Sequence, residues 1–134
     1  MDPVKIIARF RDGSIIKGFS QDFFPSKSSF HLNKDLTSTS ADLINVQVTD
    51  LKAVFFARTF EGNPKHNERK IFIKGDKPSG RKAEVTFEDD EVIQGSVLGY
   101  NANQAGFFLF PVDPNSNNMR IFVINAAVKN FRFL

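Results

Sequence analysis

KIIARFRDGSIIKGF (residues 5–19) and KAEVTFEDDEVIQGS (residues 82–96) decide the fold, because a constant shift of 77 positions relates them. The same shift aligns residues 5–57 with residues 82–134 without a gap and gives 11 identities in 53 positions. The identical pairs are Lys5/Lys82, Phe10/Phe87, Asp12/Asp89, Ile16/Ile93, Gly18/Gly95, Phe30/Phe107, Leu32/Leu109, Ile44/Ile121, Val46/Val123, Lys52/Lys129 and Phe56/Phe133. Because a fixed period is the mark of a structural repeat, the chain contains an internal duplication.

Each copy has the pattern of a short all-β unit. In copy one the β-branched run 5–10 ends at Asp12-Gly13, a strong signal for a tight hairpin, and Gly18 in the next strand indicates a bend or the close approach of another backbone. Five short strands in each copy predict two small, strongly bent β-barrels in tandem. No segment keeps a helical period for ten residues, so no long helix is expected. The strands are expected at 5–10, 15–19, 29–32, 43–48 and 53–57, and at 83–87, 92–97, 107–110, 120–124 and 130–134.

Charge divides the chain into three parts that match the repeat. Residues 1–57, the first barrel, carry a net charge of +1, and residues 83–134, the second barrel, carry −3. Residues 58–82 carry 8 basic and 3 acidic side chains, net +5, and are expected to form a basic linker. A strip of this kind could track a phosphate backbone. The simpler interpretation is a solvated linker with an intramolecular counterpart in the acidic turn 88–91. The candidate anion contacts are Lys65, Arg69, Lys70, Lys74, Lys77 and Arg81.

The strand order resembles the Sm-like small barrel: a strand, an Asp-Gly turn, a strand containing Gly, then Asp22, two strands, a single turn and a last strand. The whole chain is similar to a bacterial family of duplicated small-barrel proteins, in the segments 11–13, 22–25, 51–56 and 106–111. Related modules occur near PilZ and receiver domains, so the resemblance implies a bacterial cytoplasmic protein with a role in signalling. The Asn and the basic-Gly pair of Sm-like RNA binding are missing, as are the PilZ motifs for a cyclic dinucleotide, and both activities are therefore disfavoured.

The two copies differ on the outward face of their third and fourth strands. Copy two has large apolar residues where copy one has His31, Asn33, Asn45 and Gln47. The resulting apolar patch is large enough to need a cover. Copy one or the linker could pack on it, a second copy or a partner protein could, or a small apolar ligand could lie between the barrels. The residues expected at this interface are Phe108, Phe110, Phe122 and Ile124, with Phe24 and Phe55 of copy one as candidates for the opposing surface.

Nothing in the sequence assembles a catalytic or metal site. The chain has no Cys, which excludes disulfides and thiolate chemistry, and its two histidines, His31 and His66, are expected to be bystanders. No apolar run approaches the length of a membrane span and Met1-Asp2-Pro3 does not begin a signal peptide, so we expect a cytoplasmic protein without membrane contact. The expected function is that of a non-catalytic binding or adaptor protein without a cofactor, which acts in bacterial signalling through a protein partner or self-association. The alternative is nucleic-acid binding by the linker and the barrel rims.

Overall fold

The computed structural model describes residues 3–34 and 43–134 and is all-β, as predicted. Over these residues the only helical segments are two single 3-10 turns, Val48–Asp50 and Asn125–Ala127, which precede the last strand of each copy. The ten strands are β1 Val4–Phe10, β2 Ile15–Ser20, β3 Ser29–Asn33, β4 Leu43–Gln47, β5 Leu51–Ala57, β6 Arg81–Phe87, β7 Val92–Val97, β8 Gly106–Pro111, β9 Asn118–Ile124 and β10 Val128–Phe133.

The two hairpins quoted at the outset fold alike. In copy one Gly13 adopts a φ of 93°, and the Asp12 carboxylate accepts hydrogen bonds from the amide (2.8 Å) and hydroxyl (2.6 Å) of Ser14. In copy two Asp90 takes the left-handed position with a φ of 69°, and Asp89 accepts the amide of Glu91 at 3.0 Å. An aspartate tolerates this backbone conformation better than most residues. The turn chemistry is therefore preserved although the glycine is not.

Close backbone approach explains the two equivalent glycines of β2 and β7. A Cβ on Gly18 would lie 3.0 Å from the carbonyl oxygen of Asn33 on β3. A Cβ on Gly95 would lie 2.5 Å from the carbonyl oxygen of Phe110 on β8. The approach predicted at Gly18 is confirmed, and it lets the sheet bend sharply at the same place in both copies.

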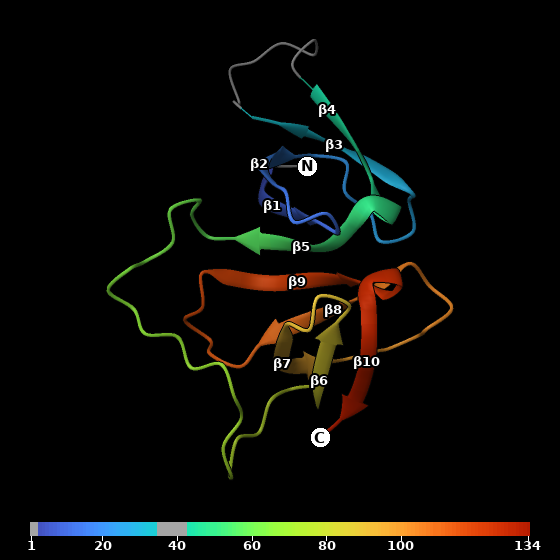
Figure 1. Cartoon of the computed structure of the whole chain (residues 1–134). Helices are drawn as coiled ribbons and strands as arrows, with labels where there is room; N and C mark the ends of the chain where they lie inside the picture. The colour runs from blue at the N-terminus through green and yellow to red at the C-terminus, as the bar shows by residue number, and fades with distance from the viewer. Residues whose placement is uncertain (1–2, 35–42) are drawn as a thin grey trace.

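All ten strands belong to one antiparallel sheet, in the order β10-β6-β7-β8-β9-β5-β1-β2-β3-β4 (Figure 1). Each copy supplies five neighbouring strands, and the halves meet where β5 pairs with β9 along Ala53↔Val123 to Ala57↔Asn118. The prediction of two small barrels in tandem is therefore wrong for this structure, since the sheet does not close into a barrel. Closure of copy one would require β5 to pair with β4, but the outer edge of β5 is occupied by β9. The sheet is open, with β4 at one end and β10 at the other.

The junction strands contribute side chains to two hydrophobic cores. On one face Val54 and Phe56 of β5 join Phe122 and Ile124 of β9 in the core of copy one. On the other face Ala53 joins the core of copy two, together with alternate residues of β9. Because successive side chains of a strand point to opposite faces, one pair of strands can complete both cores. This arrangement explains why β5 is more apolar than its counterpart β10, and why β9 is more apolar than its counterpart β4.

Candidate functional site

The apolar patch predicted on copy two lies against copy one. Phe122 and Ile124 are buried in the copy-one core, and Phe108 packs half-buried at its margin. The ring of Phe23 meets the ring of Phe122 edge-on, with centroids 5.3 Å apart. Arg120 lies over the ring of Phe108 at 4.6 Å and covers the outer side of the cluster. The interface in this structure is thus an intramolecular one.

The other three residues expected at that interface lie elsewhere. Phe55 is half-buried on the opposite face of β5, against the copy-two core. Phe24 is exposed and carries the ammonium of Lys27 over its ring at 4.8 Å. Phe110 lines a separate surface cleft beside Phe72 of the linker. The six residues therefore do not form one surface.

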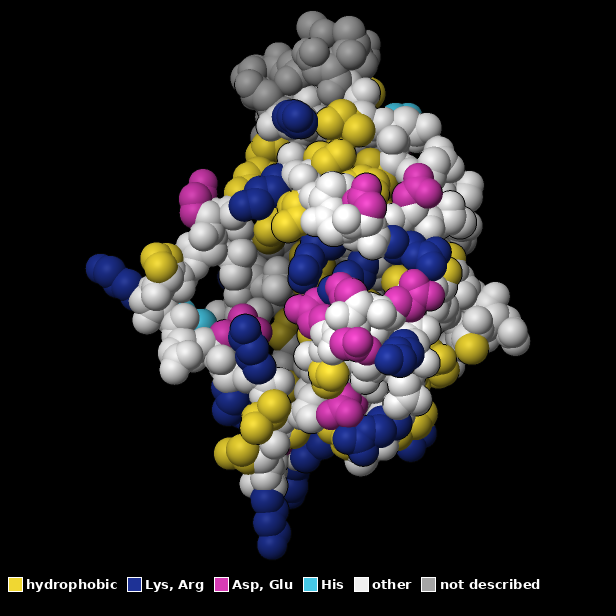
Figure 2. All heavy atoms as spheres, viewed as in Figure 1, with side chains coloured by type: hydrophobic (Ala, Val, Ile, Leu, Met, Phe, Trp, Pro, Cys, Tyr) yellow, Lys and Arg dark blue, Asp and Glu magenta, His cyan; other side chains and the backbone are white. Residues whose placement is uncertain are grey.

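A second feature of the junction is the charge cluster around the acidic turn 88–91, where acidic and basic side chains interleave at the centre of the face shown in Figure 2. The Lys52 side chain is only 5% exposed, and its ammonium binds the Asp89 carboxylate at 2.7 Å and the Glu91 carboxylate. The partner carboxylates are much more exposed, 56% for Asp89. The Lys52 ammonium also lies 4.7 Å from the centroid of the Phe87 ring. Lys52 is thus a buried cation from copy one held by the hairpin of copy two.

The remaining acidic side chains of the turn are also paired within the chain. Arg11 contacts Glu88 at 2.8 Å and Arg9 contacts Glu91 at 3.3 Å, both across the junction. Lys129 contacts Asp90 at 2.8 Å within copy two. The intramolecular counterpart of the acidic turn is therefore a set of basic residues on β1, the turn after β1, β5 and β10. The linker, which the sequence analysis suggested for this role, supplies none of these ion pairs.

Two members of the cluster have a shifted pKa. The hydrogen bond from the Lys52 ammonium, followed by the one from the amide of Glu91, lowers the pKa of Asp89 below its usual value. The hydrogen bond to Asp90 raises the pKa of Lys129. Each shift favours the charged form of its group, Asp89 or Lys129.

Lys52 was not singled out as a functional residue from the sequence. Its signal was the identity of Lys52 and Lys129 at equivalent positions next to a hairpin rich in acidic residues. The same residue type is buried at one position and exposed at the other because only Lys52 lies at the junction.

The six basic residues expected as anion contacts do not behave alike. Arg69 forms a 2.7 Å ion pair with Asp76, and the guanidinium of Arg81 stacks 3.6 Å from the centroid of the Phe133 ring. Four lysines have no ion pair or hydrogen bond through their side chains among the described residues. They are Lys65, Lys70, Lys74 and Lys77.

Asp113, between β8 and β9, docks the linker onto copy two. Its carboxylate accepts hydrogen bonds from the amides of Asn115 (2.9 Å) and Arg69 (3.1 Å) and contacts Nε2 of His66 at 2.8 Å. These interactions, led by the amide of Asn115, lower the pKa of Asp113 below its usual value of 3.8. His66, expected to be a bystander, is therefore part of this structural contact; His31 likewise contacts Asp22 at 2.7 Å.

We predict that Asp113→Asn loosens the linker. The substitution removes the charged acceptor of the Arg69 amide and the charge beside His66, so trypsin should cleave after Lys70 and Lys74 several times faster than in the wild type at pH 7. Because the Asp113 pKa is lower in the folded state, its stabilisation is present above 3.8 and is lost as the pH falls through the lowered value. The amide resonance of Arg69 should therefore move toward its unfolded position in that acid range.

The exposed Asp50 provides the matched control for this experiment. Asp50→Asn should leave the cleavage rate of the linker unchanged. Equal cleavage of wild type and Asp113→Asn would contradict the docking role of Asp113.

The outer edges of the sheet are a third candidate site. In copy one the outer edge of β5 pairs with β9, whereas its counterpart β10 ends the sheet and has no strand beyond it among the described residues. Phe133 is 37% exposed and Leu134 49% exposed at this edge. The faces of the two strands differ accordingly: Asn130 and Arg132 of β10 correspond to the apolar Ala53 and Phe55 of β5. Of the two edge segments that the sequence analysis considered, 54–57 lies inside the sheet and only 131–134 is at an edge.

No group of three or more His, Cys, Asp or Glu side chains is arranged to hold a metal ion within residues 3–34 and 43–134. Over the same residues no helix is long and apolar enough to cross a membrane.

The fold and its sites define an all-β protein built from two copies of a five-strand unit. The copies are joined through β5 and β9, and basic side chains form ion pairs with the acidic turn 88–91. The chain belongs to DUF6982, a family of unknown function, whose model matches residues 2–134. No curated protein and no solved structure matches the chain.

Proposed function

We propose that this protein is a non-catalytic binding module that takes up a strand of a protein partner along the outer edge of β10. The observation that carries the proposal is the difference between the two equivalent strands. The outer edge of β5 is paired with β9, while the same edge of β10 is unpaired among the described residues. The pairing of β9 with β5 supports the proposal, because β10 is the counterpart of β5. A role in bacterial signalling, as an adaptor, rests on the resemblance of the sequence alone.

The backbone of β10 has the geometry needed for strand addition. The amide of Leu134 donates to the carbonyl of Lys82 on β6 at 2.9 Å. Because amides alternate between the two sides of an antiparallel strand, those of Phe131 and Phe133 point to the outer edge. Main-chain hydrogen bonds give affinity in this mode of recognition, and side-chain pockets give selectivity. The exposed side chains of Phe133 and Leu134 favour a partner strand that also carries apolar residues.

A peptide of residues 118–124, flanked by lysines for solubility, is the natural probe because it is the strand that β5 accepts. We expect it to bind the full-length chain and to shift the amide resonances of β10. Phe133→Pro removes an amide on the outer edge, where proline is tolerated. Phe133→Ala removes the same ring but keeps the amide. The alanine variant should retain binding and the proline variant should lose it.

Equal binding of the peptide by both variants would overturn the proposal. Light scattering coupled to size-exclusion chromatography distinguishes the kind of partner. A monomer points to another protein as the partner, and an oligomer that Phe133→Pro dissociates identifies a second copy of this chain as the added strand.

A second candidate function, nucleic-acid binding, is favoured by the linker lysines. The acidic side chains of the turn 88–91 form ion pairs with basic residues outside the linker, namely Arg9, Arg11, Lys52 and Lys129. The acidic turn therefore does not neutralise the four linker lysines, Lys65, Lys70, Lys74 and Lys77. If these four lysines bind a phosphate backbone, the affinity for a fluorescent single-stranded oligonucleotide should fall steeply as salt rises. Replacing all four by glutamine should abolish the binding, and replacing Lys5, Lys27 and Lys34 should not. A salt-independent affinity would exclude this function.

A further inference from the structure

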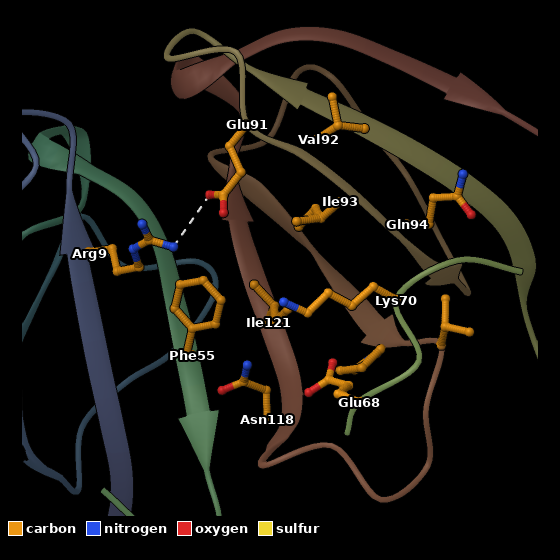
Figure 3. Close-up of a pocket in the computed structure, with 12 residues that line it drawn as sticks. Arg9, Phe55, Glu68, Lys70, Glu91, Val92, Ile93, Gln94, Asn118 and Ile121 are labelled. Carbon is orange, nitrogen blue, oxygen red and sulfur yellow. Dashed lines mark hydrogen bonds and ion pairs between the residues drawn. The ribbon is translucent and has the colours of Figure 1, made fainter. Parts of the chain in front are cut away.

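A cleft of about 300 Å³ lies at the junction and takes residues from both copies and from the linker. Figure 3 shows its apolar floor, formed by Phe55 of β5, Ile121 of β9 and Ile93 of β7. Its volume is at the lower limit of the range for small-molecule sites, roughly 300–1,000 Å³. The cleft is distinct from the β10 edge, because none of its lining residues lies on β10.

The charged side chains at the rim of the cleft differ in the partners that they have within the chain. The Glu91 carboxylate is held by Arg9 and Lys52, and the Glu68 carboxylate accepts a hydrogen bond from the hydroxyl of Ser116 at 2.8 Å. The ammonium of Lys70 has no such partner among the described residues. In Figure 3 its side chain extends from the linker across the cleft toward Ile121.

A second cation lies on the opposite wall. The guanidinium of Arg9 is 5.6 Å from the centroid of the Phe55 ring, and one of its nitrogens contacts Glu91 at 3.3 Å. An arginine has five N–H donors, so this contact leaves others for a ligand. The cleft therefore combines an apolar floor with an unpaired lysine and an incompletely used arginine.

We propose that this cleft binds a small organic anion with an apolar body, such as a monocarboxylate with a short alkyl chain or one aromatic ring. The carboxylate would accept hydrogen bonds from Lys70 and Arg9, and the apolar body would cover Phe55, Ile93 and Ile121. A carboxylate matches Lys70 and Arg9, whereas a cationic ligand would meet these two charges and find Glu91 already held by Arg9 and Lys52 and Glu68 already hydrogen-bonded to Ser116. The positive side chains of the cleft thus favour an anionic ligand, and the apolar floor favours a ligand with an apolar body.

Titration of the full-length ¹⁵N-labelled chain with sodium octanoate tests the proposal. We expect saturable shifts of the amides of Phe55, Ile93 and Ile121, with a Kd of about 1 mM or tighter. Sodium acetate, which lacks the apolar body, and octyltrimethylammonium chloride, which carries the opposite charge, should not produce these shifts at the same concentrations.

Two variants of the linker separate a specific site from general attraction. Lys70→Met keeps most of the side-chain length and removes the charge, and should weaken octanoate binding about fivefold. Lys74→Met is the matched control, because Lys74 does not line the cleft, and it should bind octanoate like the wild type. Both positions are exposed, so both variants should fold normally.

Three results would overturn the proposal. The first is equal binding of octanoate and octyltrimethylammonium, which would show an apolar surface without charge selectivity. The second is an equal Kd for Lys70→Met and Lys74→Met. The third is the absence of saturable shifts at the cleft up to about 10 mM octanoate.

Discussion

Phe122→Ala should lower the free energy of unfolding by about 3–5 kcal/mol, the range for truncating a buried phenylalanine. Phe122 is 2% exposed and enters the core of the other copy, where its ring meets those of Phe23 and Phe108. The loss therefore removes contacts between the two halves as well as apolar burial. Urea unfolding followed by far-UV circular dichroism measures the change.

Asn45 supplies the matched control, since it occupies the equivalent position in copy one. It lies on β4 at the end of the sheet. Asn45→Ala should change the free energy of unfolding by no more than about 0.5 kcal/mol, as is usual for a surface substitution. Similar costs for the two substitutions would contradict the junction between β5 and β9.

Lys52→Glu is expected to be the second most damaging substitution, with a cost of at least about 3 kcal/mol. The Lys52 side chain is buried and stands between Asp89 and Glu91. A glutamate there would bury a third carboxylate beside two others in place of the cation that they bind. Lys52→Met should cost much less, because the two exposed partner carboxylates can return to water.

Lys129→Glu is the control for this prediction, because Lys129 is the counterpart of Lys52 and is well exposed. Lys129→Glu should cost far less than Lys52→Glu, because an exposed ion pair contributes little to stability. The same urea titration compares the three variants. If Lys52→Glu were as mild as Lys129→Glu, Lys52 would not be buried at the junction in solution.

Much of the fold could be predicted because repetition and alternation are visible in the sequence. The shift of 77 residues gave the strand complement of both copies, and Asp12-Gly13 gave the hairpin turn. The differences between copies also indicated which face of copy two is apolar, since Phe122 and Ile124 replace polar residues. The hairpin turn and the alternation of apolar residues depend on residues close together in the chain, so they can be recognised in the local sequence.

The connection between the halves could not be predicted in the same way. Main-chain hydrogen bonds form between any two strands, so the sequence of β5 does not say whether β4 or β9 will occupy its outer edge. The burial of Lys52 and the docking of the linker by Asp113 depend on contacts 37 and 44 residues apart in the chain. Such contacts leave no periodic signal. Two closed barrels and one open sheet therefore have nearly the same local pattern.

Hydrogen exchange at four backbone amides measures whether β10 offers a free edge that a strand can occupy. Val54 and Phe56 on β5 are the counterparts of Phe131 and Phe133 on β10. In the free chain the β10 amides should exchange much faster than those of β5, and the peptide of residues 118–124 should slow them. In the monomeric chain, slow exchange of Phe131 and Phe133 without the peptide, or no slowing with it, would contradict a free edge at β10.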